Sequence, residues 1–261
     1  MIDVTMSDTL SGSDVVHSAA TALDAPSAVE FMREALIKIS EDDIAVVASL
    51  LEQKHQRLVG KLQSDSLTSG GAELAEWLLR QMFATRRRSK EIIESTGPEE
   101  ILGSVRDLIH GDEPISVRFN QFDSKLSEMD SRVRHDFAGE CLRFSKPDEY
   151  WLWARWMWDP MARTGALPLV LVNEFDFDGA NAGEVYERVG NAITAVVETA
   201  DALGFGGLTA NRFAVDVYLA AIYGVYLYTV TRMRMTQEFN KVIPNLPELV
   251  RRLLGVYRLE N

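Results

Sequence analysis

The chain has one cysteine and only four histidines among its 261 residues. A single cysteine, Cys141, excludes an intramolecular disulfide, a two-thiol redox centre and a metal site built on a Cys-x-x-Cys knuckle. The absence of disulfide capacity is typical of proteins from a reducing compartment. Residues 1–25 contain neither Lys nor Arg, so they lack the basic start of a secretory signal and the arginines of a transit peptide. We therefore expect a cytoplasmic protein.

The sequence also lacks an apolar run long enough for a membrane. The segment Val217–Thr231 contains fifteen consecutive uncharged residues, whereas a single span needs about twenty. Several of these residues are tyrosines, whose hydroxyl groups find partners more readily in a packed protein than among lipid tails. The pattern favours a buried core helix over an oligomer interface, and it disfavours a membrane partner.

Positive charge is scarce, because 27 basic residues face 39 acidic ones and the net charge is −12. This balance disfavours a sequence-independent nucleic-acid binder, which needs surplus Lys and Arg to neutralise phosphates. The dense basic cluster is centred on Arg86, Arg87 and Arg88. On an acidic chain such a cluster is a candidate site for an acidic partner or a phosphate-bearing ligand, and a solvated helix face is the alternative.

Helix signals follow one another along residues 26–261, and strand signals are nearly absent. Ser40 before three acidic residues predicts a helix N-cap. Further helices are predicted at about residues 73–94, 98–110, 181–203, 211–235 and 245–257, and one or two helices over residues 114–144. Residues 167–172 have strand character, but one strand cannot form a sheet, so we interpret them as an extended connection or a short edge strand. The sequence predicts an all-α protein of about 8 to 11 helices, with residues 26–261 forming one domain.

Four of the five tryptophans fall within eight residues, at Trp151, Trp153, Trp156 and Trp158. In a helix, Trp153 and Trp156 would share one face, while Trp151 and Trp158 would lie nearly opposite. A helix that is apolar on both sides normally packs between other elements. We therefore predict a central core helix that ends at Pro160. The alternative is a partner- or ligand-binding surface, for which Trp, Tyr, Met and Arg are the enriched residues.

Two acid-x-x-His pairs are the candidate metal ligands. Glu52 with His55, and Asp107 with His110, would each place two ligands on one helix face, as in carboxylate-bridged di-iron bundles. The bundle pattern uses Glu rather than Asp and needs two further glutamates, which the sequence does not identify. His55 also follows Lys54 directly, which is typical of a solvated face. We therefore predict no cofactor, and keep these four residues as the metal candidates.

Residues 1–25 are rich in Ser, Thr and Asp and have no sustained helical periodicity. Such composition predicts a flexible arm, or one that becomes ordered on a partner. Scattered apolar residues, including Ile2, Val4 and Leu10, would suit docking into a groove of another chain.

Taken together, these features favour a non-catalytic accessory, adaptor or assembly protein that acts through contacts with another protein or with a second copy of itself. The reasons are the acidic arm, the segregated basic cluster and the excess of aromatic side chains. One alternative is a helical enzyme or carrier with a non-haem metal at the acid-x-x-His pairs. The other is a small-ligand binder whose pocket is walled by the tryptophans.

Overall fold

The computed structural model describes residues 37–171, 175–202, 211–234 and 244–257, together with residues 30, 33, 34 and 208. Within these residues the chain forms ten α-helices, one short 3-10 helix (η1) and no β-strand, which confirms the predicted all-α fold. In chain order the elements are α3 (Glu41–Val59), α4 (Ser64–Ser69), α5 (Ala72–Gln81), α6 (Ser89–Thr96), α7 (Pro98–His110), α8 (Ile115–Lys125), α9 (Ser131–Ser145), η1 (Leu167–Leu169), α10 (Ala182–Ala202), α11 (Ala214–Arg234) and α12 (Leu246–Leu253). The predicted arm, residues 1–25, lies outside the described residues, as does the domain boundary predicted at residue 26.

Several helices begin where local capping chemistry predicts. The Ser40 hydroxyl accepts a hydrogen bond from the backbone N–H of Asp43, and the Asp43 carboxylate accepts one from the backbone N–H of Ser40. Asn181 and Asn245 each accept a backbone N–H from three residues further on. Pro98 occupies the first turn of α7, where its missing N–H costs nothing. These contacts confirm the predicted starts of α3, α7, α10 and α12.

The helix predicted over residues 73–94 is instead two helices, α5 and α6, separated by a turn. The backbone N–H groups of Phe83 and Ala84 donate to the carboxylate of Glu140, at 3.1 and 3.2 Å. The prediction of one continuous helix is therefore wrong, because a carboxylate from α9 binds the backbone at this point.

The extended connection expected at residues 167–172 is also corrected, because it begins with η1. Pro168 stands in the first turn of η1, and the carbonyl of Leu167 accepts hydrogen bonds from the backbone N–H groups of Val170 and Leu171. These short-range bonds close a turn instead of leaving the backbone extended.

The tryptophan segment, Trp151–Trp158, is not a helix, so the core helix predicted there is wrong. It has irregular backbone with a single turn, and it crosses α9 in direct contact. Gly139 permits this approach, since a Cβ at that position would lie 2.8 Å from the backbone nitrogen of Trp153. The backbone N–H of Arg155 donates to Asp136 at 2.7 Å. Tertiary contacts with α9 have replaced the helical hydrogen bonds that the apolar periodicity suggested.

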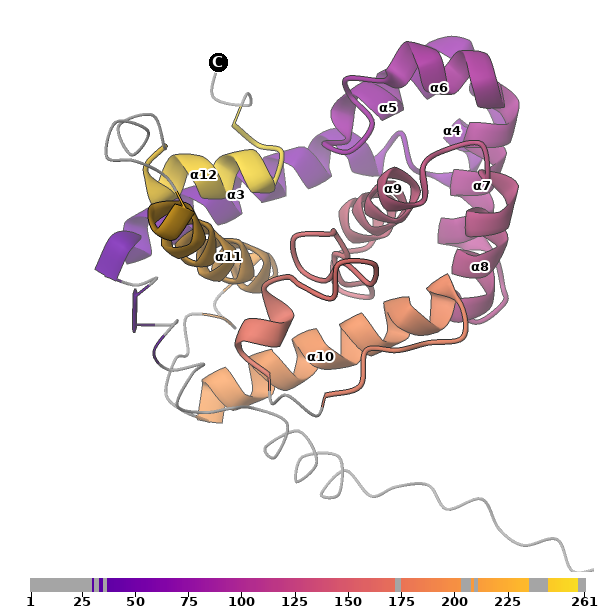
Figure 1. Cartoon of the computed structure of the whole chain (residues 1–261). Helices are drawn as coiled ribbons and strands as arrows, with labels where there is room; N and C mark the ends of the chain where they lie inside the picture. Colours follow the sequence, from indigo (N-terminus) through magenta and orange to yellow (C-terminus); the bar gives the residue numbers. More distant parts are fainter. Residues whose placement is uncertain are drawn as a thin grey trace, which may run out of the picture.

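Helix α9 lies at the centre of the arrangement. Figure 1 shows it nearly end-on, with α7 and α8 on one side, α3, α11 and α12 on the other, and α10 below. Twelve of its fifteen residues are buried. Four of these are charged, and each forms an ion pair with another part of the chain: Arg134 with Asp123, Asp136 with Arg155, Glu140 with Lys54 and Arg143 with Asp216. The pairing compensates the charges for the loss of water.

Helix α11 is buried mainly through apolar side chains, as the sequence predicts. All nine residues of Ala214–Ile222 are buried, and Asp216 is the charged one. Its partner is Arg143, at 2.7 Å. Among the described residues, no helix combines the length and apolar character needed to cross a bilayer. The prediction that this helix is among the most buried is confirmed, whereas α9 takes the place predicted for a tryptophan helix.

Candidate functional site

A pocket of about 360 Å³ opens beside the middle of α9. It lies where the turn after α5, the tryptophan segment, α11 and the end of α12 converge on that helix. Its walls are formed by Phe83, Ala84, Asp136, Glu140, Phe144, Leu152, Ala154, Arg155, Trp156, Tyr223, Leu253 and Leu254. The structure thus brings part of the tryptophan segment close to Phe83 and Ala84, which lie just before the basic cluster Arg86–Arg88 in the sequence.

One acid of the pocket wall, Glu140, belongs to a buried ion pair. The Nζ of Lys54 donates to Glu140 at 2.6 Å, and both side chains are almost fully buried. Glu140 also accepts the backbone N–H groups of Phe83 and Ala84, so its charge is met by three donors. The Lys54 ammonium lies 4.3 Å from the ring centre of Phe144, which adds a cation–π contact. Glu140 therefore holds the backbone of Phe83 and Ala84 in the pocket wall.

The second pocket acid, Asp136, lies one helical turn before Glu140 on α9. Its carboxylate accepts from both the backbone nitrogen and the Nε of Arg155, each at 2.7 Å. Burial raises the pKa of Asp136 to about 6, an effect that the neighbouring Glu140 charge strengthens and Arg155 opposes. Asp136 therefore titrates just below neutral pH while it holds the tryptophan segment to α9.

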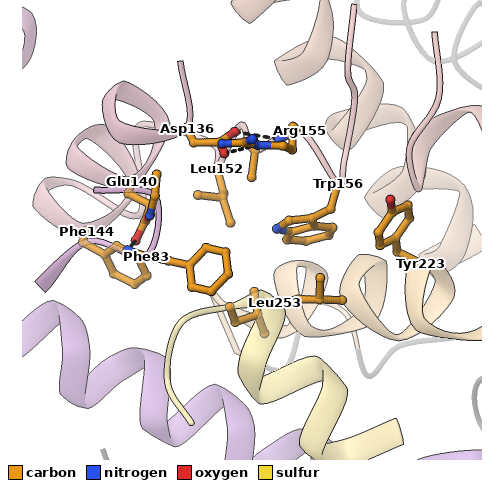
Figure 2. A pocket seen from close by; sticks show the side chains of 12 residues that line it. Phe83, Asp136, Glu140, Phe144, Leu152, Arg155, Trp156, Tyr223 and Leu253 are labelled. Atoms are coloured by element: carbon orange, nitrogen blue, oxygen red, sulfur yellow. Dashed lines mark hydrogen bonds and ion pairs between the residues drawn. The ribbon is translucent and has the colours of Figure 1, made fainter. Parts of the chain in front are cut away.

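The other walls are aromatic and aliphatic. Figure 2 shows Trp156 between Tyr223 and Phe83, with its indole nitrogen directed toward the space between Phe83 and Leu152, and Leu253 below. The ring centres of Trp156 and Tyr223 are 6.3 Å apart. The indole N–H forms no hydrogen bond with any residue that the structure describes. The Trp156 indole N–H is therefore a hydrogen-bond donor within a largely apolar surface.

The other three tryptophans of the segment support the fold away from the pocket. Trp153 and Trp158 are 2% and 3% exposed, and the Trp153 indole N–H donates to the carbonyl of Trp158. Trp158 stacks on Phe177 with ring centres 4.3 Å apart. Trp151 is half-buried. Of the four predicted site tryptophans, Trp156 is the one that lines the pocket.

The basic cluster has three different environments. The guanidinium carbon of Arg86 lies 4.8 Å from the ring centre of Phe83 at the edge of the pocket. Arg87 is exposed. Arg88 forms two hydrogen bonds with Glu91, at 3.0 and 2.6 Å, and is exposed as well. Arg86 is therefore the member of the cluster that contacts a pocket residue, and it forms a cation–π pair there.

The first pair of metal candidates is engaged in separate protein contacts. Glu52 binds the guanidinium of Arg212 at 2.7 and 3.0 Å, and this hydrogen bonding lowers the pKa of Glu52. His55 is 7% exposed, and its Nδ1 hydrogen-bonds to the carbonyl of Phe144 at 2.8 Å. The solvated face expected for His55 is wrong, because the imidazole fixes the last turn of α9 against α3.

The second pair likewise has local partners. Asp107 accepts from Lys125 at 2.9 Å and from Arg106 at 2.8 Å, and both are partly exposed pairs. His110 hydrogen-bonds through Nε2 to the carbonyl of Leu62 at 2.7 Å. Throughout the described ranges, no three His, Cys, Asp or Glu side chains are grouped so that they could hold a metal ion.

The pocket also contains residues that the sequence analysis did not select. Asp136 and Glu140 have the four-residue spacing that puts two acids on one helix face, and this signal was available. Without the fold, however, such a pair resembles a solvated face. Phe83 and Tyr223 gave no signal, because they reach the pocket only through contacts between elements distant in sequence.

Comparisons with protein-family models, with curated proteins and with solved structures found no match for this chain. The function proposed below therefore derives from the geometry and chemistry of the pocket.

Proposed function

We propose that this chain is a non-catalytic accessory or adaptor protein that acts through contacts with another protein or a second copy of itself, and that the pocket beside α9 is its contact site. One observation carries the proposal. The pocket has aromatic walls, and both of its carboxylates are already held by cations of the same chain, Lys54 and Arg155. Such acids support the walls of a binding surface.

The edge of the pocket has the composition of an interaction surface. Among the residues that the structure describes, Phe83 is one of the few large apolar side chains that stay exposed, at 36%. Arg86 lies over its ring. Aromatic residues and Arg are enriched at protein interfaces, where a few of them supply most of the binding energy. A volume of about 360 Å³ is at the small end of ligand pockets, which suits one or two side chains of a partner.

The state of the single cysteine, Cys141, also supports a binding role over a catalytic one. Cys141 is fully buried in α9, and burial raises the pKa of its thiol well above the ordinary value. A thiol in this state is a poor nucleophile. Its burial also agrees with the proposed cytoplasmic location, in which a lone cysteine remains reduced.

A second candidate function is the binding of a small organic ligand. The specific observation in its favour is the mixture of several apolar walls with very few polar groups, which is typical of ligand pockets. In this case the chain would act as a carrier or sensor, and the partner protein would be secondary.

Site-directed photocrosslinking in the source cells tests the proposal. The photoreactive residue p-benzoylphenylalanine would replace Phe83 in one variant and Val46 in the control, because Val46 is similarly exposed, at 44%, but lies on α3 away from the pocket walls. We expect a defined protein adduct from position 83 and not from position 46. A doubled mass would identify a second copy as the partner. Equal adduct patterns at both positions, or none at position 83, would refute a protein-contact role for the pocket.

Native mass spectrometry of the gently purified protein separates the second candidate from the first. A retained small molecule that is lost from a Trp156→Ala variant would favour the ligand carrier. A chain of unmodified mass, together with a crosslinked partner, would favour the adaptor.

A further inference from the structure

We propose that the pocket recognises an apolar group that carries a carboxylate, a chemistry supplied either by the carboxyl-terminal residue of a partner chain or by a small organic acid. The inference rests on the proposed binding function, and it adds the chemical class of the ligand. It is carried by a mismatch between hydrogen-bond acceptors and donors in the pocket wall.

Both carboxylates in the wall already bind donors of the same chain. Glu140 accepts from Lys54 and from the backbone N–H groups of Phe83 and Ala84, at 2.6, 3.1 and 3.2 Å. The two oxygens of Asp136 each accept from Arg155 at 2.7 Å. A cationic ligand would have to displace Lys54 or Arg155 from its carboxylate, and that exchange would leave the displaced charge without its partner.

The donors, in contrast, have capacity left. Arg155 uses its backbone nitrogen and Nε for Asp136, while its two terminal nitrogens form no hydrogen bond with the described part of the chain. Its side chain is 42% exposed. The indole N–H of Trp156 also has no partner among the described residues, and it points into the pocket (Figure 2). A ligand that brings acceptors therefore gains hydrogen bonds here.

The local charge favours an anionic acceptor over a neutral one. Within the wall, Lys54 and Arg155 balance Glu140 and Asp136, so the pocket interior carries no excess negative charge. Guanidinium groups bind carboxylates through short, charge-assisted hydrogen bonds, often two at a time. An anion is thus favoured at this pocket although the whole chain carries a net charge of −12.

The apolar part of the ligand is set by the remaining walls. Phe83, Leu152, Trp156, Tyr223 and Leu253 surround the space below Arg155 (Figure 2). A group the size of a phenyl or isobutyl side chain fits a volume of about 360 Å³ and would be covered by these side chains. Its burial supplies affinity, and the carboxylate at Arg155 and Trp156 supplies orientation.

A pair of probes that differ only in charge tests the inference. N-acetyl-L-phenylalanine carries the carboxylate, whereas N-acetyl-L-phenylalaninamide has the same ring and a neutral amide. The protein would be labelled with 5-fluorotryptophan, and the fluorine resonance of Trp156 would be assigned among the five tryptophans by its loss in Trp156→Phe. We expect the acid to shift the Trp156 resonance, and to bind about tenfold more tightly than the amide, because hydrogen bonds to charged groups are the stronger ones.

Two variants identify the groups responsible. Trp156→Phe keeps an aromatic wall and removes the N–H, so calorimetry should show the acid bound about tenfold more weakly. The double variant Asp136→Asn, Arg155→Gln replaces a buried ion pair by a neutral amide pair, which protects the fold, and it should abolish the preference for acid over amide. Trp158→Phe is the matched control, since Trp158 is buried away from the pocket, and its affinity for the acid should be unchanged.

The source of the carboxylate is resolved by a third probe. If the tetrapeptide acetyl-Ala-Ala-Ala-Phe binds as tightly as N-acetyl-L-phenylalanine or more tightly, a partner chain is the source. If only the small acid binds, the source is a free organic acid. Both results support the recognition of a carboxylate. Equal affinity for acid and amide, a preference for the amide, or no Trp156 shift at the solubility limit of the acid would overturn it. A crosslinked partner at position 83 together with any of these results would leave the proposed function standing without the carboxylate.

Discussion

Helices α9 and α11 are both deeply buried, but they are built in opposite ways. Helix α9 brings four charged side chains into the interior and pairs each one with a different part of the chain. Helix α11 buries Ala214–Ile222 with one charged residue, Asp216, which pairs back to Arg143 of α9. Apolar packing supplies favourable burial without strong orientation, whereas an ion pair depends on geometry.

The two helices therefore contribute to the fold in different ways. The pairs of α9 reach α3, α8, α11 and the tryptophan segment, so α9 sets how these parts meet, including the walls of the pocket. Helix α11 adds apolar surface to the same core. A buried ion pair is a weak source of net stability, but removing one partner is costly, because the other charge stays buried alone. Substitutions in α9 should therefore change the free energy of unfolding more than substitutions in α11.

The largest effect is expected at Arg143, which is 1% exposed and pairs with Asp216. Its guanidinium also donates to the carbonyls of Pro147 and Tyr150. Arg143→Met should lower the free energy of unfolding by about 3 to 5 kcal/mol, since it leaves a buried carboxylate without its cation. Urea unfolding followed by circular dichroism measures the change.

The matched control for Arg143 is Arg106→Met, because Arg106 forms a similar pair at the surface. An exposed pair of this kind contributes at most about 1 kcal/mol. Equal losses of unfolding free energy in the two variants would show that a buried ion pair of α9 contributes no more to stability than an exposed one.

The second effect concerns pH and Asp136. Burial raises its pKa from 3.8 to about 6, so the folded protein holds this proton more tightly than the unfolded chain. The stability that it contributes is therefore complete below about pH 4 and is lost as the pH rises through 6. Asp136→Asn cannot ionise, and near neutral pH it should exceed the wild type in stability by up to roughly 3 kcal/mol more than at pH 4.

Urea unfolding of both proteins between about pH 4.5 and pH 7 measures this difference. In this range Asp123 does not interfere, because its contacts with His135 and Arg134 lower its pKa to about 2, against the opposing effect of burial. A constant stability difference between the two proteins would mean that Arg155 keeps Asp136 ionised throughout, and that the pair is not sensitive to pH.

The third effect concerns the contact between α9 and the tryptophan segment. An alanine Cβ at Gly139 would overlap the backbone of Trp153, so Gly139→Ala should lower stability by about 1 to 3 kcal/mol. Gly103 of α7 is the control, because a Cβ there would meet no atom within 4 Å. Gly103→Ala should instead stabilise the protein by about 0.5 to 1 kcal/mol, the usual advantage of Ala in a helix. Stabilisation of the protein by Gly139→Ala to the same extent as by Gly103→Ala would show that the crossing leaves room for a Cβ at position 139.

The sequence predicts the parts of the fold that depend on local interactions. Ser40, Pro98 and Asn245 act within a few residues of themselves, so their capping patterns identify helix starts correctly. Helix α11 is apolar over most of its length, and this too is a local signal. Helix α9 contains so many charged residues that its sequence resembles a surface helix, and its burial depends on partners far away in the chain.

The candidate site was less predictable for the same reason. Apolar spacing correctly indicates that Trp153 and Trp158 are buried. It cannot reveal that the segment crosses α9 with an irregular backbone. The crossing depends on Gly139 and on the Asp136–Arg155 contact, which join positions in separate elements. The pocket arises at this crossing, so its walls could not be identified before the fold was known.

The smallest effect is expected in α11. Tyr218 is 3% exposed, and its hydroxyl forms no hydrogen bond with the described part of the chain. Burial accordingly raises the pKa of Tyr218 well above its ordinary value. Tyr218→Phe removes a buried polar atom without opening a large cavity, so it should leave the free energy of unfolding unchanged or raise it by up to about 1 kcal/mol. A loss above about 1 kcal/mol would show that this hydroxyl is hydrogen-bonded after all, and α11 would then depend on a polar contact as α9 does.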